Sequence, residues 1–291
     1  MKQLLILSGK GGTGKTTIAS AFIKISNARA YADCDVDAPN LHLITQLLNS
    51  ELERTDYYGL PKAEIDPELC IACDQCRQKC RFDAILINHE GYKVDFIACE
   101  GCGVCDAVCP VQAVSLKPAV AGKLMLYSHG EKVFSTAQLK MGSGTSGLLV
   151  TEVKKQMKSA AVDAELAIID GSPGIGCPVI ASLSGVHMVL IVAEPSVSGI
   201  SDMERIIKTA VKFGTKIAVC INKFNINHAN TEEIELFCKK QGLPFVGKIP
   251  FDADAVKAIN NGQTIVDINC TSGIAVKETY SKVINLLFKE N

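Results

Sequence analysis

The chain has 291 residues, and a hydrophobic content of 47% supports a substantial core in one large domain or two modest ones. Its formal net charge of −1 leaves no general basic surface, so nucleic-acid binding is not expected. Thirteen cysteines behind an N-terminus that lacks a secretion signal favour a cytoplasmic, reducing location and metal binding over disulfides.

The first predicted elements are a buried strand over residues 2–7, a glycine-rich loop, and a helix over residues 16–26. The loop and helix start satisfy the pattern G-x-x-x-x-G-K-[ST], in which glycine backbones cradle phosphate and the helix N-terminus adds positive charge. Lys15 is placed to reach the β- and γ-phosphates, and the Thr16 hydroxyl to ligate Mg²⁺. The nucleotide-binding residues predicted here are Gly11, Gly12, Thr13, Gly14, Lys15, Thr16 and Thr17.

The same loop also satisfies the dinucleotide pattern G-x-G-x-x-G between Gly9 and Gly14, and acidic Asp33 and Asp35 follow ~20 residues later. A dinucleotide loop has no use for the lysine at Lys15, nor for a second acidic strand end at Asp170. The sequence therefore favours ATP over NAD.

Lys10 gives the loop a second lysine, in the form KGGTGKTT. This form resembles the deviant Walker A motif of the MinD/ParA/Mrp/nitrogenase iron protein superfamily. The resemblance implies that Lys10 is the signature lysine, which reaches across a dimer interface to the partner's nucleotide. It therefore implies an ATP-dependent homodimer, or a heterodimer with a related ATPase, with Lys10 and Lys15 as catalytic residues. A solvated loop lysine is the alternative.

A second strand over residues 28–33 is predicted to run into an acidic segment with Asp33, Asp35 and Asp37 at alternate positions. Three carboxylates beside a phosphate-binding loop favour the handling of Mg²⁺ and water. The segment resembles the superfamily's switch I, which implies that Asp35 organises the metal and the attacking water and acts in catalysis. For Asp33 and Asp37, a solvated acidic turn with helix caps stays equally open.

A helical apolar face is predicted next, through Leu41, Ile44, Leu47 and Leu48. The polar stretch over residues 51–66 is interpreted as the boundary of an insertion.

Two cysteine runs with the spacing C-x₂-C-x₂-C-x₃-C follow, the second starting 29 residues after the first (99 − 70). The first run is Cys70, Cys73, Cys76 and Cys80, and the second is Cys99, Cys102, Cys105 and Cys109. The duplication resembles the bacterial two-cluster ferredoxin over residues 62–118. Arg81 departs from that pattern, because it stands where the ferredoxin carries proline.

The resemblance implies that the fourth cysteine of each run ligates the other cluster. One [4Fe-4S] cluster is then expected on Cys70, Cys73, Cys76 and Cys109. The second is expected on Cys80, Cys99, Cys102 and Cys105. Zinc is the alternative for any single CxxC pair, and the doubled spacing disfavours it.

A hairpin is predicted around residues 128–130, and a Gly/Ser-rich stretch over residues 140–146 reads as a switch, an interface loop or a plain connector. A buried strand over residues 166–169 then ends at Asp170, which fits a Walker B aspartate. Magnesium is accordingly assigned to Thr16, Asp35 and Asp170. Cys177 lies near the place of a cluster-ligating cysteine in the nitrogenase iron protein, and its role is left open.

Residues 194–202 resemble a MinD segment in which Ser198 and Asp202 would contact the signature lysine. Asn222, Pro250 and Asp252 follow later buried strands where relatives contact the base, and they complete the predicted nucleotide-binding residues. An apolar face on the final helix is expected to dock on the core, and no apolar run approaches the ~20 residues that span a bilayer, so membrane binding is not favoured.

The predicted fold is α/β, a doubly wound, mostly parallel P-loop NTPase sheet with a small inserted 2[4Fe-4S] ferredoxin-type domain. The predicted division is 1–61 and 119–291 for the ATPase and 62–118 for the insert. By resemblance, the leading function is ATP hydrolysis coupled through dimer closure to electron transfer, with ATP, Mg²⁺ and two [4Fe-4S] clusters as cofactors. The alternatives are a carrier that delivers clusters to an accepting partner protein, and a MinD/ParA-like positioning ATPase with redox-sensing clusters.

Overall fold

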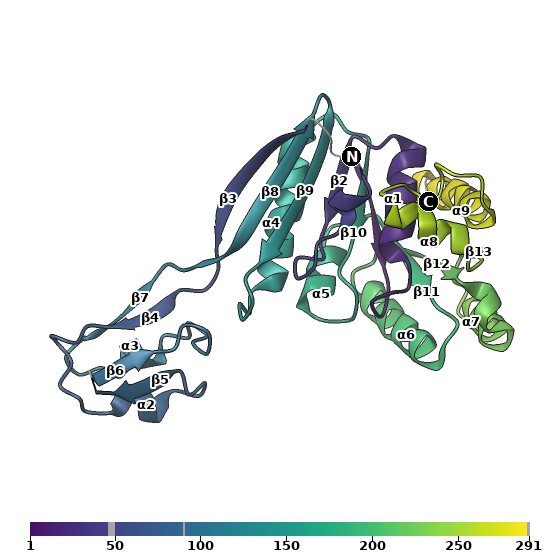
Figure 1. The fold of residues 1–291 in the computed structure, drawn as a ribbon. Helices are drawn as coiled ribbons and strands as arrows, with labels where there is room; N and C mark the ends of the chain where they lie inside the picture. The colour runs from purple at the N-terminus through teal and green to yellow at the C-terminus, as the bar shows by residue number, and fades with distance from the viewer. Residues whose placement is uncertain (46–49, 90, 290–291) are drawn as a thin grey trace.

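The computed structural model describes residues 1–45, 50–89 and 91–289 (Figure 1). The strands of its main sheet are β1 (Lys2–Leu7), β2 (Ala30–Asp33), β3 (Glu51–Tyr58), β8 (Val120–His129), β9 (Lys132–Leu139), β10 (Leu166–Asp170), β11 (Met188–Ala193), β12 (Lys216–Asn222) and β13 (Phe245–Ile249). Within the described residues this is a nine-stranded sheet in the order β13-β12-β11-β1-β10-β2-β9-β8-β3. Strands β13 to β9 pair in parallel, and β8 and β3 add two antiparallel pairings at one edge.

Helices cover both faces of the sheet, and β1 shows how alternate residues are shared between them (Figure 1). The helices are α1 (Lys15–Ser26), α4 (Ser146–Ala160), α5 (Cys177–Leu183), α6 (Val197–Lys212), α7 (His228–Lys240), α8 (Ala253–Asn260) and α9 (Thr271–Phe288), with the 3₁₀ turns η1 (Leu41–Leu43) and η2 (Phe224–Ile226). Leu4 and Ile6 belong to the core under α1 and α9, whereas Leu5 and Leu7 belong to the core under α4, α5, α6 and α7. Burial on both faces explains the unbroken apolar run of the parallel strands.

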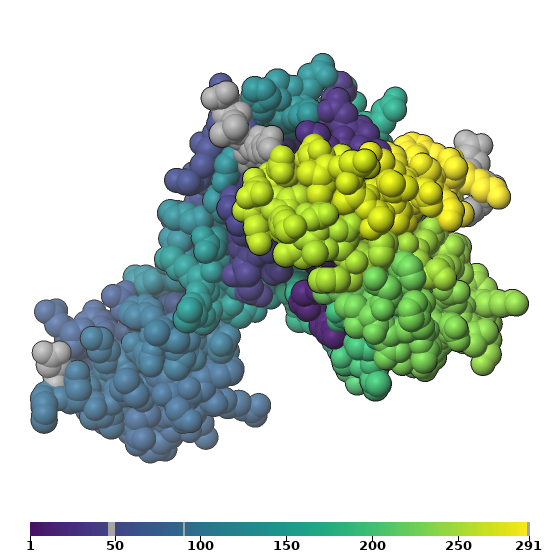
Figure 2. Space-filling model, turned by 45° about the vertical axis from the view of Figure 1, so that its right-hand side comes forward, coloured from purple at the N-terminus to yellow at the C-terminus, as the bar shows by residue number. Residues whose placement is uncertain are grey.

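An arm formed by residues 62–117 stands apart from the sheet, at the lower left in Figures 1 and 2. It contains two antiparallel pairs, β4 (Lys62–Ile65) with β7 (Val114–Lys117) and β5 (Ile85–Asn88) with β6 (Gly91–Val94). Two short helices complete it, α2 (Gln75–Lys79) and α3 (Val104–Ala107). A small core of its own, including Ala63, Ile85, Val94 and Val114, holds the arm together.

The arm leaves the sheet at the edge where the phosphate-binding loop lies. Strand β3 is antiparallel to β8, β8 is antiparallel to β9, and β9 is parallel to β2. Strand β3 therefore runs in the direction of β1, and its carboxyl end, where the arm starts, lies at the same edge as the carboxyl end of β1.

The structure adds detail to three local predictions. Within the stretch over residues 51–66, interpreted as the boundary of an insertion, residues 51–58 form the edge strand β3, and their polar sequence is explained by exposure of nearly every side chain. In the described part of the segment predicted to be helical after the acidic residues, Leu41–Leu43 form a 3₁₀ turn, and Leu47 and Leu48 lie outside the described residues. The first helix starts at Lys15, one residue before its predicted start.

Among the residues that the structure describes, no helix is both long and apolar enough to cross a membrane. The final helix α9 instead buries Val276, Val283 and Leu287 in the core that it shares with α1.

Candidate functional site

The loop from Ser8 to Gly14 joins β1 to α1 and depends on glycine for its shape. Gly12 and Gly14 have φ values of +78° and +89°, in the left-handed region that side chains disfavour. A Cβ placed at Gly14 would lie 2.1 Å from Nδ2 of Asn222, which donates a 2.7 Å hydrogen bond to the carbonyl of Thr13. The structure thus brings Asn222, predicted to contact the base, against the backbone of the loop.

Lys15, Thr16 and Asp170 meet at the start of α1. Lys15 Nζ lies 2.5 Å from Asp170 Oδ1, and the Thr16 hydroxyl donates a 2.6 Å hydrogen bond to Asp170 Oδ2. Asp170 is fully buried and Lys15 is 6% exposed, so each charge is held by the other in a low-dielectric setting. Two of the three residues assigned to magnesium are therefore in contact.

The three carboxylates of the acidic segment differ sharply in their surroundings. Asp33 is fully buried, and its oxygens accept hydrogen bonds from the backbone N–H groups of Asp35, Asn40 and Leu41. Burial, reinforced by the neighbouring charge of Asp170, raises the pKa of Asp33 to about 7. These contacts make Asp33 the residue that closes the loop over residues 34–40.

Asp35 is half-buried and lies close enough to Lys15 and Asp170 to respond to both charges. Burial raises the pKa of Asp35, while the ammonium of Lys15 lowers it. Asp37 is exposed. The structure thus brings Asp35 to the Lys15–Asp170 pair and leaves Asp37 at the surface.

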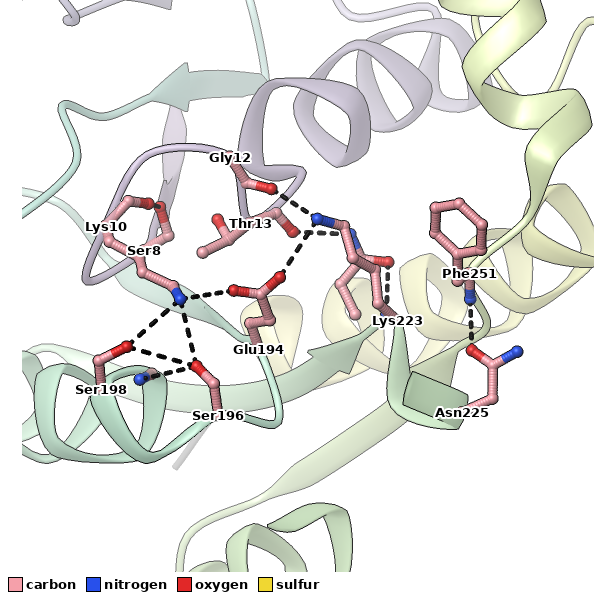
Figure 3. Close-up of polar contacts among 12 residues, drawn as sticks. Ser8, Lys10, Gly12, Thr13, Glu194, Ser196, Ser198, Lys223, Asn225 and Phe251 are labelled. Carbon is pink, nitrogen blue, oxygen red and sulfur yellow. Dashed lines mark hydrogen bonds and ion pairs between the residues drawn. The ribbon is translucent and has the colours of Figure 1, made fainter. Parts of the chain in front are cut away.

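Lys10 is held by residues that follow β11 (Figure 3). Its ammonium lies 2.8 Å from Glu194 Oε2 and donates to the hydroxyls of Ser196 at 3.2 Å and Ser198 at 3.3 Å. Ser198 is thus a partner, as the resemblance implies. The Asp202 carboxylate lies 3.9 Å from the Arg205 guanidinium. Asp202 also packs against Gly9, because a Cβ added at Gly9 would lie 2.1 Å from the Cβ of Asp202.

Glu194 and Lys223 lie in segments that the sequence singles out, but their pairing with each other was not predicted. Glu194 Oε1 lies 3.2 Å from Lys223 Nζ, which also donates a 2.7 Å hydrogen bond to the carbonyl of Gly12 (Figure 3). The two residues directly follow the strands β11 and β12; β11 is the neighbour of β1 in the sheet, and β12 is the next strand after β11. A charge at the end of a parallel strand was the signal available in the sequence.

The loop after β13 has its own internal bonding. Asp252 caps α8 and accepts hydrogen bonds from the Thr271 hydroxyl at 2.9 Å and the Ser272 N–H at 3.1 Å. Next to it, the N–H of Phe251 donates to Asn225 Oδ1 at 2.7 Å, as Figure 3 shows. Pro250 and Asp252 follow β13 at the carboxyl edge of the sheet. Oδ2 of Asp252 accepts both hydrogen bonds from the start of α9.

Two cavities in the arm are lined by cysteines from both runs. The first cavity is lined by Cys70, Cys73, Cys76 and Cys109. The second cavity is lined by Cys80, Cys99, Cys102 and Cys105. In each cavity three cysteines of one run thus face the last cysteine of the other. Among the described residues, no group of three or more His, Cys, Asp or Glu side chains is placed to hold a single metal ion. Cys177 is exposed, outside both cavities, at the start of α5.

Comparison with known proteins covers nearly the whole chain. The family model described as CobQ/CobB/MinD/ParA nucleotide binding domain matches residues 4–265. An uncharacterized protein of Methanocaldococcus jannaschii is 32% identical over 286 residues, with 97% of this chain and 96% of that protein covered. An iron-sulfur cluster carrier protein of Pyrococcus abyssi is 24% identical over 305 residues, with 98% and 86% covered. Over a shorter stretch of 56 residues, 19% of this chain and 65% of the relative, the pyruvate synthase subunit PorD of Methanothermobacter marburgensis is 38% identical.

The fold is similar to that of the septum site-determining protein MinD of Pyrococcus horikoshii, solved in complex with Mg-ADP. The TM-score is 0.57 at 17% identity, and the similarity covers 99% of this chain and 97% of that one. Together with the family match and the strand–loop–helix geometry around Lys15, this confirms the predicted P-loop NTPase sheet. The chain belongs to the CobQ/CobB/MinD/ParA nucleotide-binding family.

Proposed function

We propose that this chain is an ATP-hydrolysing iron–sulfur protein, in which nucleotide-driven dimerisation controls electron transfer through two [4Fe-4S] clusters. The observation that carries the proposal is the pair of four-cysteine cavities, in an arm that leaves the sheet at the edge of the phosphate-binding loop. The domain division 1–61, 62–118 and 119–291 belongs to the same proposal.

The donor set of each cavity fits a cubane. A [4Fe-4S] cluster takes one thiolate on each of its four irons, so its ligands must surround a volume, as the cysteines of each cavity do. The crossed contributions of Cys80 and Cys109 match the two-cluster ferredoxin arrangement. Bound clusters would supply one-electron redox chemistry. The chain's own contribution is to hold the thiols in a small apolar core and to shield them partly from solvent.

The residues around Lys15 fit the hydrolysis of ATP. Lys15 and Lys10 supply positive charge for the phosphates, and the backbone of the loop supplies N–H donors. Thr16 and Asp170, with Asp35, would hold Mg²⁺, and Asp35 would orient the attacking water. The Thr13 hydroxyl is buried without a hydrogen-bond partner among the described residues, which suits a loop that receives a polar ligand.

Electron transfer is favoured over cluster delivery by how the thiols are held. Each cavity has a full set of four thiols from this chain, and Cys99 and Cys105 are buried in the core of the arm. A cluster that has four thiolate ligands from this chain and is partly buried is expected to stay bound to the chain.

Cluster delivery is the second candidate, because a relative named as an iron-sulfur cluster carrier protein is similar along almost the full length. One cysteine of each cavity, Cys73 in the first and Cys102 in the second, is exposed and accessible to an acceptor. The third candidate, a MinD/ParA-like positioning ATPase, has no specific support beyond the shared fold.

Anaerobic purification followed by a redox titration tests the proposal. We expect about eight irons and equal acid-labile sulfide per chain, with a reduction potential or a transfer rate to an acceptor that changes between ATP, ADP and no nucleotide. Zinc without sulfide would refute the iron–sulfur assignment. Rapid loss of clusters to an apo-acceptor, with no nucleotide effect on potential or rate, would favour the carrier.

A further inference from the structure

We propose that residues 140–145, the β9–α4 segment, connect the loop over residues 34–40 to the second cavity, so that nucleotide alters that cavity and leaves the first unchanged. The inference deepens the proposed function and rests on it for the identity of the cavities as cluster sites. It concerns which of the two cavities responds to nucleotide, and which part of the chain transmits that response.

The loop over residues 34–40 is bonded on both sides to strand ends. The N–H of Cys34 donates a 2.8 Å hydrogen bond to the carbonyl of Asp170, at the end of β10. The N–H of Leu139, at the end of β9, donates a 2.8 Å hydrogen bond to the carbonyl of Val36. Val36 is fully buried between these two contacts. A movement of Asp35 toward a nucleotide must therefore displace the end of β9.

The β9–α4 segment begins at that point and is short and braced. The N–H of Lys140 donates a 2.8 Å hydrogen bond to the carbonyl of Ala121, and that of Ser143 donates a 3.1 Å hydrogen bond to the carbonyl of Lys140. Gly142 has a φ of +78°, which closes the resulting turn. Because the segment is short and hydrogen-bonded, a displacement of β9 moves the whole segment, whereas a long flexible loop would absorb it.

The segment lies against the second cysteine run. A Cβ placed at Gly142 would lie 3.1 Å from Cγ2 of Ile97, and one placed at Gly144 would lie 3.0 Å from Oε2 of Glu100. Ile97 is 74% exposed, so its contact with Gly142 can form and break without unpacking a core. Ile97 and Glu100 flank Cys99, which belongs to the second cavity.

The second cysteine run also contacts the root of the arm, which is residues 61 and 62. Lys62 Nζ donates a hydrogen bond to the carbonyl of Cys99, and a Cβ at Gly101 would lie 2.1 Å from the carbonyl oxygen of Pro61. Gly59, just before the root, packs on Thr145 at the end of the segment, where an added Cβ would lie 2.9 Å from the threonine hydroxyl. The second cavity therefore has two connections to the ATPase sheet.

The first run provides an internal control, because the duplication repeats the same turn. Asp66 accepts from the N–H of Glu68 through its side chain and from that of Cys70 through its carbonyl. Asp95 does the same for Ile97 and Cys99. The residues that line each cavity all belong to the arm, between Ile65 and Val114 for the first and between Ala63 and Leu116 for the second. The two turns share their chemistry and differ in their contact with the β9–α4 segment.

Hydrogen exchange followed by mass spectrometry compares the two turns in the full-length protein, with a non-hydrolysed ATP analogue, with ADP and without nucleotide. We expect the analogue to change exchange of residues 95–99 by at least about threefold and to leave residues 66–70 within the error of the method. Gly142→Ala should abolish the response, because it strains a left-handed residue and pushes on Ile97. Gly130→Ala is the matched control, since its φ is +56° and nothing lies within 4 Å of the added Cβ.

If Gly142→Ala does not fold, Ile97→Ala removes the same contact from the arm, and Ile87→Ala is its exposed control. Equal responses at both turns, no response at either, or a full response in the folded contact variants would overturn the proposal. Iron and sulfide are counted on the same samples. A missing cluster would refute the proposed function, while the exchange data would still decide whether the segment connects the two sites.

Discussion

Lys10 and Glu194 form a 2.8 Å ion pair beside the phosphate-binding loop, and the other oxygen of the same carboxylate lies 3.2 Å from Lys223 Nζ. One acidic residue therefore offsets two ammonium groups, one from the loop and one that bonds to the loop's backbone. Glu194 is 19% exposed, so solvent screens this charge only in part.

We predict that Glu194→Gln binds ATP more tightly, by about three- to tenfold, because both ammonium groups become available to the phosphates. Calorimetric titration at two salt concentrations measures the gain, which should shrink as salt rises. Glu204→Gln is the control, because Glu204 pairs with Lys208 at 4.0 Å on the exposed side of α6. Weaker binding by Glu194→Gln would mean that the carboxylate is needed to shape the loop.

Lys15→Ala should lose ATP affinity by about two orders of magnitude, because the phosphates lose a buried, charge-assisted donor. It should also lower stability, since Asp170 remains buried beside Asp33 without its countercharge. Fluorescence titration with a labelled nucleotide and thermal unfolding measure the two effects. Lys24→Ala, on the same helix but in an exposed pair with Asp267, should change neither property by much.

Asp35→Ala should bind ATP with nearly normal affinity and hydrolyse it at least about tenfold more slowly, because it leaves the attacking water unoriented. Steady-state phosphate release and equilibrium binding separate the two properties. Asp37→Ala is the matched control, since Asp37 is exposed. Normal turnover in Asp35→Ala, or slow turnover in Asp37→Ala, would transfer the role to another carboxylate of the segment.

Replacing one exposed thiol in either cavity should remove one cluster and spare the other. Cys73→Ser and Cys102→Ser should each retain about four irons per chain, half of the expected content, with nucleotide binding unaltered. Iron, sulfide and electron paramagnetic resonance identify the site that remains. Cys177→Ser tests the cysteine left open by the sequence, and it should keep the full iron content because Cys177 lies outside both cavities. A loss of iron in that variant would assign it a ligand role.

Asp252 links the start of α8 to the start of α9, so Asp252→Ala should destabilise the fold by about 1–2 kcal/mol. The Ser272 N–H, as the leading cause, lowers the pKa of Asp252 to about 2. Its ionised form is therefore favoured by folding, and the stabilisation is present above the unfolded pKa of about 4 and lost as pH falls toward 2. Urea unfolding of both proteins at several pH values should show the difference shrink over that interval. Asp254→Ala, in an exposed pair with Lys257, should show little difference at any pH.

The sequence by itself determined the phosphate-binding loop and the two cysteine runs, because each is contiguous and its chemistry needs those residue types at that spacing. A strand, a glycine loop and a helix start with Lys15 and Thr16 form one local unit whose geometry is set over a few residues. The buried strand ending at Asp170 was equally visible, since burial on both faces leaves an unbroken apolar run.

Only the tertiary structure decided which distant residues complete the site. Strand β3 is polar because it is an exposed edge, so no apolar period marked it, and its pairing with β8 is what sends the arm out at the edge of the phosphate-binding loop. Glu194 meets Lys10 because the sheet order sets the carboxyl ends of β11 and β1 side by side. Such contacts depend on the order of strands in the sheet, and the local sequence around each residue does not contain that order.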